Sequence, residues 1–193
     1  MSPFRPLYDW ALRQAERPGA PYVLFGVAFA ESSFFPLPPD ILLLPMALAQ
    51  RTKAWLYATI CTAGSVLGGL GGYALGALFY ATLGRWIIDT YGLQEGFERF
   101  SHGFQEWGVV LILIKGLTPI PFKLVTIASG VAHLDLVPFV AASFLTRGAR
   151  FFLVAALVRW LGEPVRTFVE KYLTWVGLGL LALIVGGFWI ALR

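Results

Sequence analysis

Long apolar runs alternate with shorter polar segments along the chain. Two runs, 54–84 and 172–192, contain no Asp, Glu, Lys or Arg. About 20 apolar residues are enough for a helix to cross the hydrocarbon core of a bilayer. Each run therefore predicts a transmembrane helix, and the run 137–161 predicts a third, although it contains Arg147 and Arg150.

Two further apolar runs are interrupted by prolines. The run 22–50 contains FPLPPD at residues 35–40, and the run 108–136 contains TPIPFK at residues 118–123. Proline removes a backbone donor and clashes with the preceding helical turn. A helix over 22–35 covers only about 21 Å, which is less than the hydrocarbon core of about 30 Å. The pattern favours re-entrant hairpins that enter and leave on the same side, with a single kinked span as the alternative.

The two halves of the chain repeat one order: an amphipathic surface segment, a broken hairpin and a long span. An offset of 83 relates Pro36 to Pro119, Pro38 to Pro121, Asp40 to Lys123 and Gly64 to Arg147. Interrupted apolar segments at corresponding places are typical of transporters built from internal repeats. We therefore expect the four prolines to shape the two hairpin tips.

These patterns predict an all-α integral membrane protein with one membrane domain over 1–193. Its parts are an amphipathic N-terminal segment (1–21), a first repeat (22–84), an amphipathic surface helix (85–106), a second repeat (107–161) and a C-terminal transmembrane helix (172–192). The two repeats form an inverted pair with opposed re-entrant hairpins, and about three helices cross the membrane fully.

Composition supports a membrane protein and excludes several functions. The 193 residues are 58% hydrophobic and 13% charged, and the mean hydropathy is +0.71. A soluble domain of this size cannot bury so much apolar surface. The net charge of +4 comes from scattered basic residues that flank apolar runs, so it indicates lipid headgroups rather than nucleic acid. Neither His102 nor His133 belongs to a metal-ligand or Ser–His pattern, so we expect no cofactor, no metal and no enzyme.

The positive-inside rule orients the chain. With the N-terminus in the cytoplasm, the segments 1–21, 51–53 and 159–171 hold most of the basic residues, and only Arg85, Arg99 and Arg193 lie outside. We therefore expect a multi-pass membrane protein whose N-terminus lies in the cytoplasm. The two hairpins then enter from opposite faces.

Glycines recur every four residues in the first long span. Gly64, Gly68, Gly72 and Gly76 share one helix face, and small residues at this spacing allow a neighbouring helix to pack closely. Close packing is the expected role, and a smooth groove for a lipid tail is the alternative.

Six ionisable residues lie within apolar runs: Glu31, Asp40, Lys115, Lys123, Arg147 and Arg150. Each costs roughly 2.5–3.5 kcal/mol near the bilayer centre, which indicates a function or mutual pairing. The four cations outnumber the two acids, so the group has an excess of positive charge. A phosphate monoester would balance this excess, and the planar guanidinium of arginine matches phosphate geometry. The cations are therefore candidate phosphate-binding residues. Glu31 and Asp40 are candidates for proton coupling or gating, because a carboxylate is protonated more readily in a low-dielectric cavity.

An ordered set of motifs resembles the DedA family, also called the SNARE-associated or VTT-domain family. The set comprises E-x4-P-x-P-x-D from Glu31 to Asp40, G-x3-G-x3-G-Y-x2-G from Gly64 to Gly76, and K-x6-G from Lys123 to Gly130. The resemblance implies two opposed re-entrant hairpins. Bacterial members are linked to movement of undecaprenyl phosphate and to proton-dependent transport, and eukaryotic relatives scramble phospholipids. The family's acidic pair falls on Glu31 and Asp40. One member of its basic pair falls on Lys123, and Lys115 is the nearest candidate for the other. The family usually has arginines at closer spacing in these positions.

The leading hypothesis is a lipid-phosphate transporter that flips undecaprenyl phosphate or scrambles phospholipid, with protons as a coupling partner. A proton-coupled exporter of small amphipathic compounds and a non-catalytic membrane scaffold are the alternatives. A scaffold would tolerate neutral residues at Asp40 and Lys123. Membrane lipid is the expected partner, and the sequence leaves open a homo-oligomer.

Overall fold

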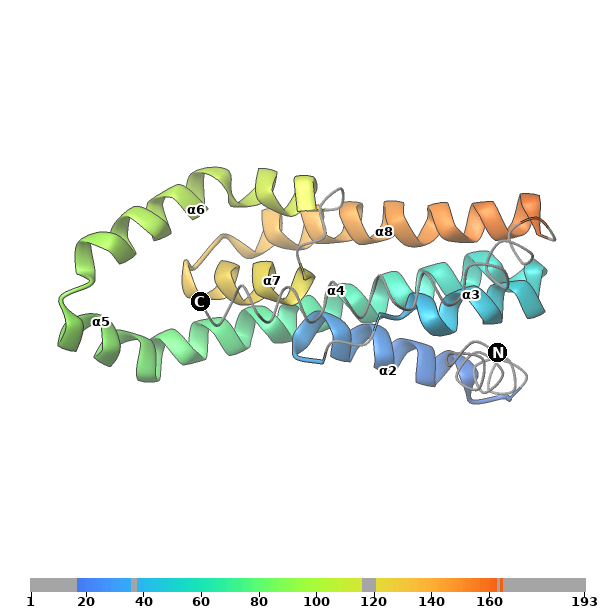
Figure 1. Ribbon diagram of the computed structural model, residues 1–193, viewed down its shortest axis with the longest axis horizontal. Helices are drawn as coiled ribbons and strands as arrows, with labels where there is room; N and C mark the ends of the chain where they lie inside the picture. The colour runs from blue at the N-terminus through green and yellow to red at the C-terminus, as the bar shows by residue number, and fades with distance from the viewer. Residues whose placement is uncertain (1–16, 36–37, 116–120, 163, 165–193) are drawn as a thin grey trace, which may run out of the picture.

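Helices make up the architecture of the described chain (Figure 1). The computed structural model describes residues 17–35, 38–115, 121–162 and 164, and these residues contain no strand. The α-helices are α2 (Ala20–Ser33), α3 (Asp40–Ala49), α4 (Ala54–Phe79), α5 (Arg85–Tyr91), α6 (Gln94–Lys115), α7 (Phe122–Val131) and α8 (Leu136–Leu161). The prediction of an all-α chain is confirmed over these residues. The predicted C-terminal helix 172–192 and most of the segment 1–21 lie outside them.

Two long helices form the axis of the molecule. Helical structure is continuous over Arg51–Tyr91, because a 3-10 turn (η1, Arg51–Lys53) precedes α4 and a π-helical turn (η2, Tyr80–Gly84) joins α4 to α5. This helix and α8 are both long and apolar enough to cross a membrane. Figure 1 shows α4 and α8 side by side and running in opposite directions.

The predicted single surface helix over 85–106 is wrong, because the structure divides it at Gly92. Gly92 has φ 64°, a left-handed conformation that ends α5 and that glycine adopts without steric cost. The residues before Gly92 continue the long helix that begins at η1. The residues from Gln94 onward belong to α6. This helix continues without interruption into the apolar run 108–136 and ends at Lys115.

Two short helices follow the two proline-rich breaks. Pro39 is the N-cap of α3 and Pro121 the N-cap of α7, and each helix has ten residues, or about 15 Å. In Figure 1, the outer ends of α2 and α3 lie at the right-hand end of the molecule, and those of α6 and α7 lie toward the left-hand end. The two pairs therefore approach the middle of the molecule from opposite ends.

The two repeats are related by 82 residues rather than the predicted 83. α3 and α7 begin at Asp40 and Phe122, and α4 and α8 begin at Ala54 and Leu136. Pro39, rather than Pro38, is thus the counterpart of Pro121. The proline pattern misled the count because three of the four positions from 36 to 39 are prolines.

The outer faces of the long helices are apolar. Large side chains are exposed on both, among them Leu67 (48%), Leu78 (63%), Phe144 (60%) and Leu153 (60%). The interior holds two clusters, one formed by α2, α3, α4 and α8 and the other by α4, α6, α7 and α8. An apolar exterior around a packed interior is the arrangement that a bilayer accommodates.

Candidate functional site

The glycine face of α4 is covered by two other helices. A Cβ at Gly68 would lie 2.2 Å from the Phe29 carbonyl oxygen in α2, and one at Gly76 would lie 2.1 Å from the Ile127 carbonyl oxygen in α7. Both distances are far below any van der Waals contact, so only glycine allows this approach. The glycines thus bring α2 and α7 against the same face of α4, one after the other.

The inner ends of α2 and α7 meet at the middle of α4. The Ser33 hydroxyl of α2 donates to the Gly68 carbonyl oxygen at 2.8 Å, which holds the end of α2 on α4. The Thr126 hydroxyl of α7 donates to the Ser32 carbonyl oxygen at 3.2 Å, which links the two repeats directly. Gly72 lies between them, since a Cβ there would be 2.4 Å from Thr126 Oγ1.

A buried arginine lies beside this junction. The Arg147 side chain of α8 is 2% exposed, and its Nη2 donates to Glu31 Oε2 at the end of α2. Its guanidinium carbon lies 5.0 Å from the centre of the Phe122 ring and 4.9 Å from that of Phe151. Arg147 is therefore held by one carboxylate and two aromatic faces.

Two serines complete a ring of hydrogen bonds around this ion pair. Arg147 Nε donates to Ser65 Oγ at 2.5 Å, and the hydroxyls of Ser65 and Ser32 are 2.6 Å apart. Ser32 Oγ in turn donates to Glu31 Oε2 at 3.1 Å. A consistent donor assignment runs from Arg147 through Ser65 and Ser32 to Glu31, which the arginine also contacts directly.

Ser65 and Arg147 occupy equivalent positions in the two repeats, since they are 82 residues apart. They contact each other because equivalent residues on α4 and α8 meet where the two antiparallel helices cross at their centres. The sequence motifs gave no sign of Ser65. The repeat offset, counted from Pro39 and Pro121 instead of Pro38, would have placed it opposite Arg147.

The Ser65→Ala substitution is expected to lower the free energy of unfolding by about 1–3 kcal/mol, because it leaves the buried Arg147 Nε–H without its acceptor and Ser32 Oγ without a donor. Ser143→Ala is the matched control: both serines are 0% exposed, but Ser143 Oγ has no hydrogen-bond partner among the described residues. The control should leave stability unchanged or higher. Thermal unfolding of the two variants in detergent measures the difference, and equal effects would contradict a stabilising ring.

A second ion pair joins α8 to α3 nearer the surface. Arg150 Nη2, one turn after Arg147, donates to Asp40 Oδ2 at 2.6 Å, with side chains that are 48% and 28% exposed. Asp40 begins α3, where the helix dipole favours a negative charge. Its other oxygen, Oδ1, is buried and has no hydrogen-bond partner within the described residues. Asp40 therefore retains an unused acceptor.

The remaining candidates are the two lysines and the prolines of the two breaks. Lys123 lies in the first turn of α7 and is half-buried, and it forms no ion pair with any described residue. Among the described residues Asp40 pairs with Arg150 and not with Lys123. Lys115 is the last residue of α6, and its side chain lies outside the described part. Pro36 and Pro119 lie outside it as well.

Metal-binding groups are absent from the part of the chain that the structure describes. No three His, Cys, Asp or Glu side chains there are close enough to hold a metal ion. The candidate site is therefore defined by two arginines, two carboxylates and a nearby lysine.

These features define a class: a helical membrane protein with internally paired charges where two opposed helical hairpins meet. The family model of the VTT domain matches residues 37–160, which include Asp40, Lys123 and both arginines. The chain belongs to this family, the DedA or SNARE-associated family that the sequence motifs resemble. Glu31 lies just before the matched range.

Relatives match this chain over most of their length. An uncharacterized protein of Haemophilus influenzae is 35% identical over 193 residues, covering 98% of each chain. An uncharacterized protein of Histophilus somni is 32% identical over 180 residues, covering 92% of each chain. One from Methanocaldococcus jannaschii is 28% identical over 134 residues, covering 68% of this chain and 79% of its own. No solved structure matches the chain.

Proposed function

We propose that the protein moves phosphate-bearing lipids, undecaprenyl phosphate or phospholipid, across the bacterial inner membrane. The proposal rests on two ion pairs at the junction of the two hairpins, Glu31–Arg147 and Asp40–Arg150. The lipid is moved unchanged, so the proposal includes no covalent step. The tail stays in the bilayer while the head passes through the site.

Substrate binding is an exchange of one anion for another on the arginines. A guanidinium binds phosphate and carboxylate with the same planar pair of donors. A lipid phosphate that reaches Arg150 therefore competes with Asp40 for it. Lys123, which has no ionic partner among the described residues, adds a further positive charge on the other side of the junction.

Protons take part because a protonated carboxyl group no longer competes for arginine. A proton on Asp40 removes its charge and releases Arg150 to the phosphate, which carries between one and two negative charges near neutral pH. Asp40 is the more accessible of the two acids, at 28% against 17% for Glu31, and its Oδ1 has no donor among the described residues. We therefore assign the coupling proton to Asp40 and a holding role to Glu31.

The hairpins are re-entrant in this proposal. The end where α2 begins and where α3 and α8 end carries Arg17, Arg51, Lys53 and Arg159. The elements of the other end, which are α5, the start of α6 and the N-cap of α8, carry four acids (Asp89, Glu95, Glu98 and Asp135) against two cations (Arg85 and Arg99). The positive-inside rule then places the first end in the cytoplasm. A cysteine introduced at Thr52 in a Cys61→Ser background tests this orientation, because a membrane-impermeant reagent should modify it only from the cytoplasmic side.

The test of function is a flipping assay with the purified protein in proteoliposomes. The Asp40→Asn substitution is expected to slow movement of labelled undecaprenyl phosphate or phospholipid about ten- to hundredfold, because a permanently neutral residue cannot displace the phosphate from Arg150 again. The retained phosphate then leaves against a charge-assisted hydrogen bond worth about 1.5–3 kcal/mol. Lys123→Gln should also slow it. Arg99→Gln, which removes an exposed charge paired with Glu95, is the control and should have no effect.

Two outcomes decide between this function and its alternatives. If the wild-type protein moves neither lipid but exports small amphipathic compounds under a proton gradient, the exporter replaces the lipid transporter. If Asp40→Asn and Lys123→Gln behave like Arg99→Gln, a scaffold explains the protein better. Collapse of the proton gradient should slow the wild type, and an unchanged rate would remove the coupling role of Asp40.

A further inference from the structure

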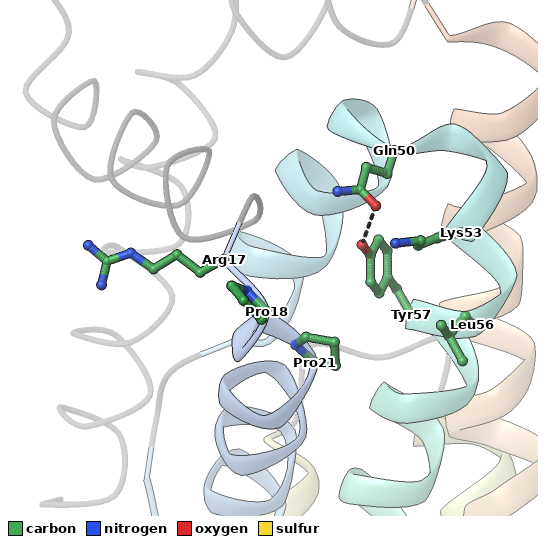
Figure 2. A pocket seen from close by; sticks show the side chains of 7 residues that line it. All are labelled: Arg17, Pro18, Pro21, Gln50, Lys53, Leu56 and Tyr57. Atoms are coloured by element: carbon green, nitrogen blue, oxygen red, sulfur yellow. Dashed lines mark hydrogen bonds between the residues drawn. The ribbon is translucent and has the colours of Figure 1, made fainter.

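A cavity of about 210 Å³ opens at the end of the molecule where α2 begins, α3 ends and α4 begins (Figure 2). It lies apart from the ion-paired site, because its residue Tyr57 precedes Ser65 by eight positions, or about 12 Å along α4. One water occupies about 30 Å³ of the liquid, so a phosphate group fits the cavity. Prolines 18 and 21 line its side next to α2.

The polar part of the cavity is formed by Tyr57 and Gln50. The Tyr57 side chain is 3% exposed, and its hydroxyl donates to Gln50 Oε1 at 3.3 Å (Figure 2). The Gln50 amide nitrogen carries two N–H groups, and it makes no hydrogen bond with the described residues. An anion in the cavity would therefore meet donors that the protein itself does not use.

The charged residues that line the cavity are positive over the part of the chain that the structure describes. Lys53 and Arg17 line it, no described acidic side chain does, and neither cation forms an ion pair with a described residue. In Figure 2, Lys53 points toward Tyr57, whereas Arg17 lies at the rim and extends away from the Tyr57–Gln50 pair. A cation at the inner wall and another at the mouth attract an anion from the membrane surface.

An apolar path leads out of the cavity along α4. Leu56, which lines the cavity, is 51% exposed, and Ala63 and Leu67 follow it at intervals of seven and four residues with exposed side chains. This spacing places the three residues on one face of the helix. The path from Leu56 to Leu67 is about 16 Å long, so the cavity continues into a surface suited to an acyl chain.

We propose that this cavity binds the phosphate group of an anionic membrane lipid, whose chain lies along the exposed face of α4. The head contacts Lys53 and the Gln50 amide, and Arg17 at the rim attracts it electrostatically. The site binds lipid whether or not the ion-paired centre transports it. Phosphatidylglycerol has the required chemistry, and phosphatidylcholine, whose head carries no net charge, does not.

Native mass spectrometry of the full-length protein titrated with phosphatidylglycerol or phosphatidylcholine tests the site. Each cation is worth about fivefold in affinity at a membrane surface. Arg17→Gln with Lys53→Gln should therefore weaken phosphatidylglycerol binding by about 25-fold and leave phosphatidylcholine binding unchanged. Arg85→Gln with Arg99→Gln removes two exposed cations from the other end, and phosphatidylglycerol should bind this control like the wild type.

The outcomes separate the proposal from general charge effects. Equal binding by the two double variants would overturn it, whether binding is lost in both or retained in both. Displacement of phosphatidylglycerol by inorganic phosphate alone would overturn the lipid as ligand and assign the cavity to free phosphate. Gln50→Leu, which leaves the charge unchanged, should also weaken phosphatidylglycerol binding, and no effect would contradict the assigned contact. Thermal unfolding checks that each variant is folded.

Discussion

Glu31→Gln is expected to lower the free energy of unfolding by about 3–5 kcal/mol, because it leaves the buried Arg147 guanidinium without its counter-charge. Arg147→Met should have an effect of the same size through the uncompensated carboxylate. The double variant should recover most of the stability, since it contains neither charge. Unfolding in detergent, followed by tryptophan fluorescence, measures the three variants.

Transport by the same three variants separates a structural salt bridge from a substrate site. If Arg147 only holds α8 against α2, the double variant should flip lipid phosphate at nearly the wild-type rate. If Arg147 binds the phosphate, as we propose, the double variant should be stable yet inactive. Arg99→Gln serves again as the control, because its partner Glu95 is 79% exposed and such a pair contributes less than about 1 kcal/mol. An active double variant would restrict the phosphate site to Arg150 and Lys123.

Gly130→Ala is expected to lower the free energy of unfolding by about 3 kcal/mol or more, because the new Cβ would lie 1.9 Å from the Tyr73 carbonyl oxygen. The backbone of α4 cannot yield as a flexible side chain would, so α7 must move away. Gly76→Ala should act similarly through Ile127. Both changes displace the tip that carries Lys123, so they should also slow lipid flipping.

Gly26→Ala provides the matched control for the glycine variants. Gly26 lies within α2, and a Cβ there meets nothing within 4 Å. Alanine forms helix better than glycine by about 1 kcal/mol, so this variant should be as stable as the wild type or slightly more stable. If Gly130→Ala unfolds at the same temperature as Gly26→Ala, the close packing of α7 on α4 is incorrect.

The elements that the sequence predicted well are those set by local chemistry. The break between α2 and α3 coincides with FPLPPD, and the break between α6 and α7 with TPIPFK, because clustered prolines remove several backbone donors at once and clash with the preceding turn. The apolar run 137–161 corresponds to α8 within one residue. The helix over 85–106 was wrong because amphipathic periodicity does not reveal a left-handed glycine, and Gly92 alone ends α5.

The sequence by itself determined that this is an all-α membrane protein of the VTT-domain family, and which charges lie within apolar runs. Apolar length, proline and motif order are properties of continuous segments, so they can be read without a structure. Only the tertiary structure decided that Asp40 pairs with Arg150 and Glu31 with Arg147. These partners are more than 100 residues apart, and a helix turns by about 100° per residue. An error of one residue in the repeat offset therefore moves a side chain to another face, which is why Ser65 emerged only from the packed helices.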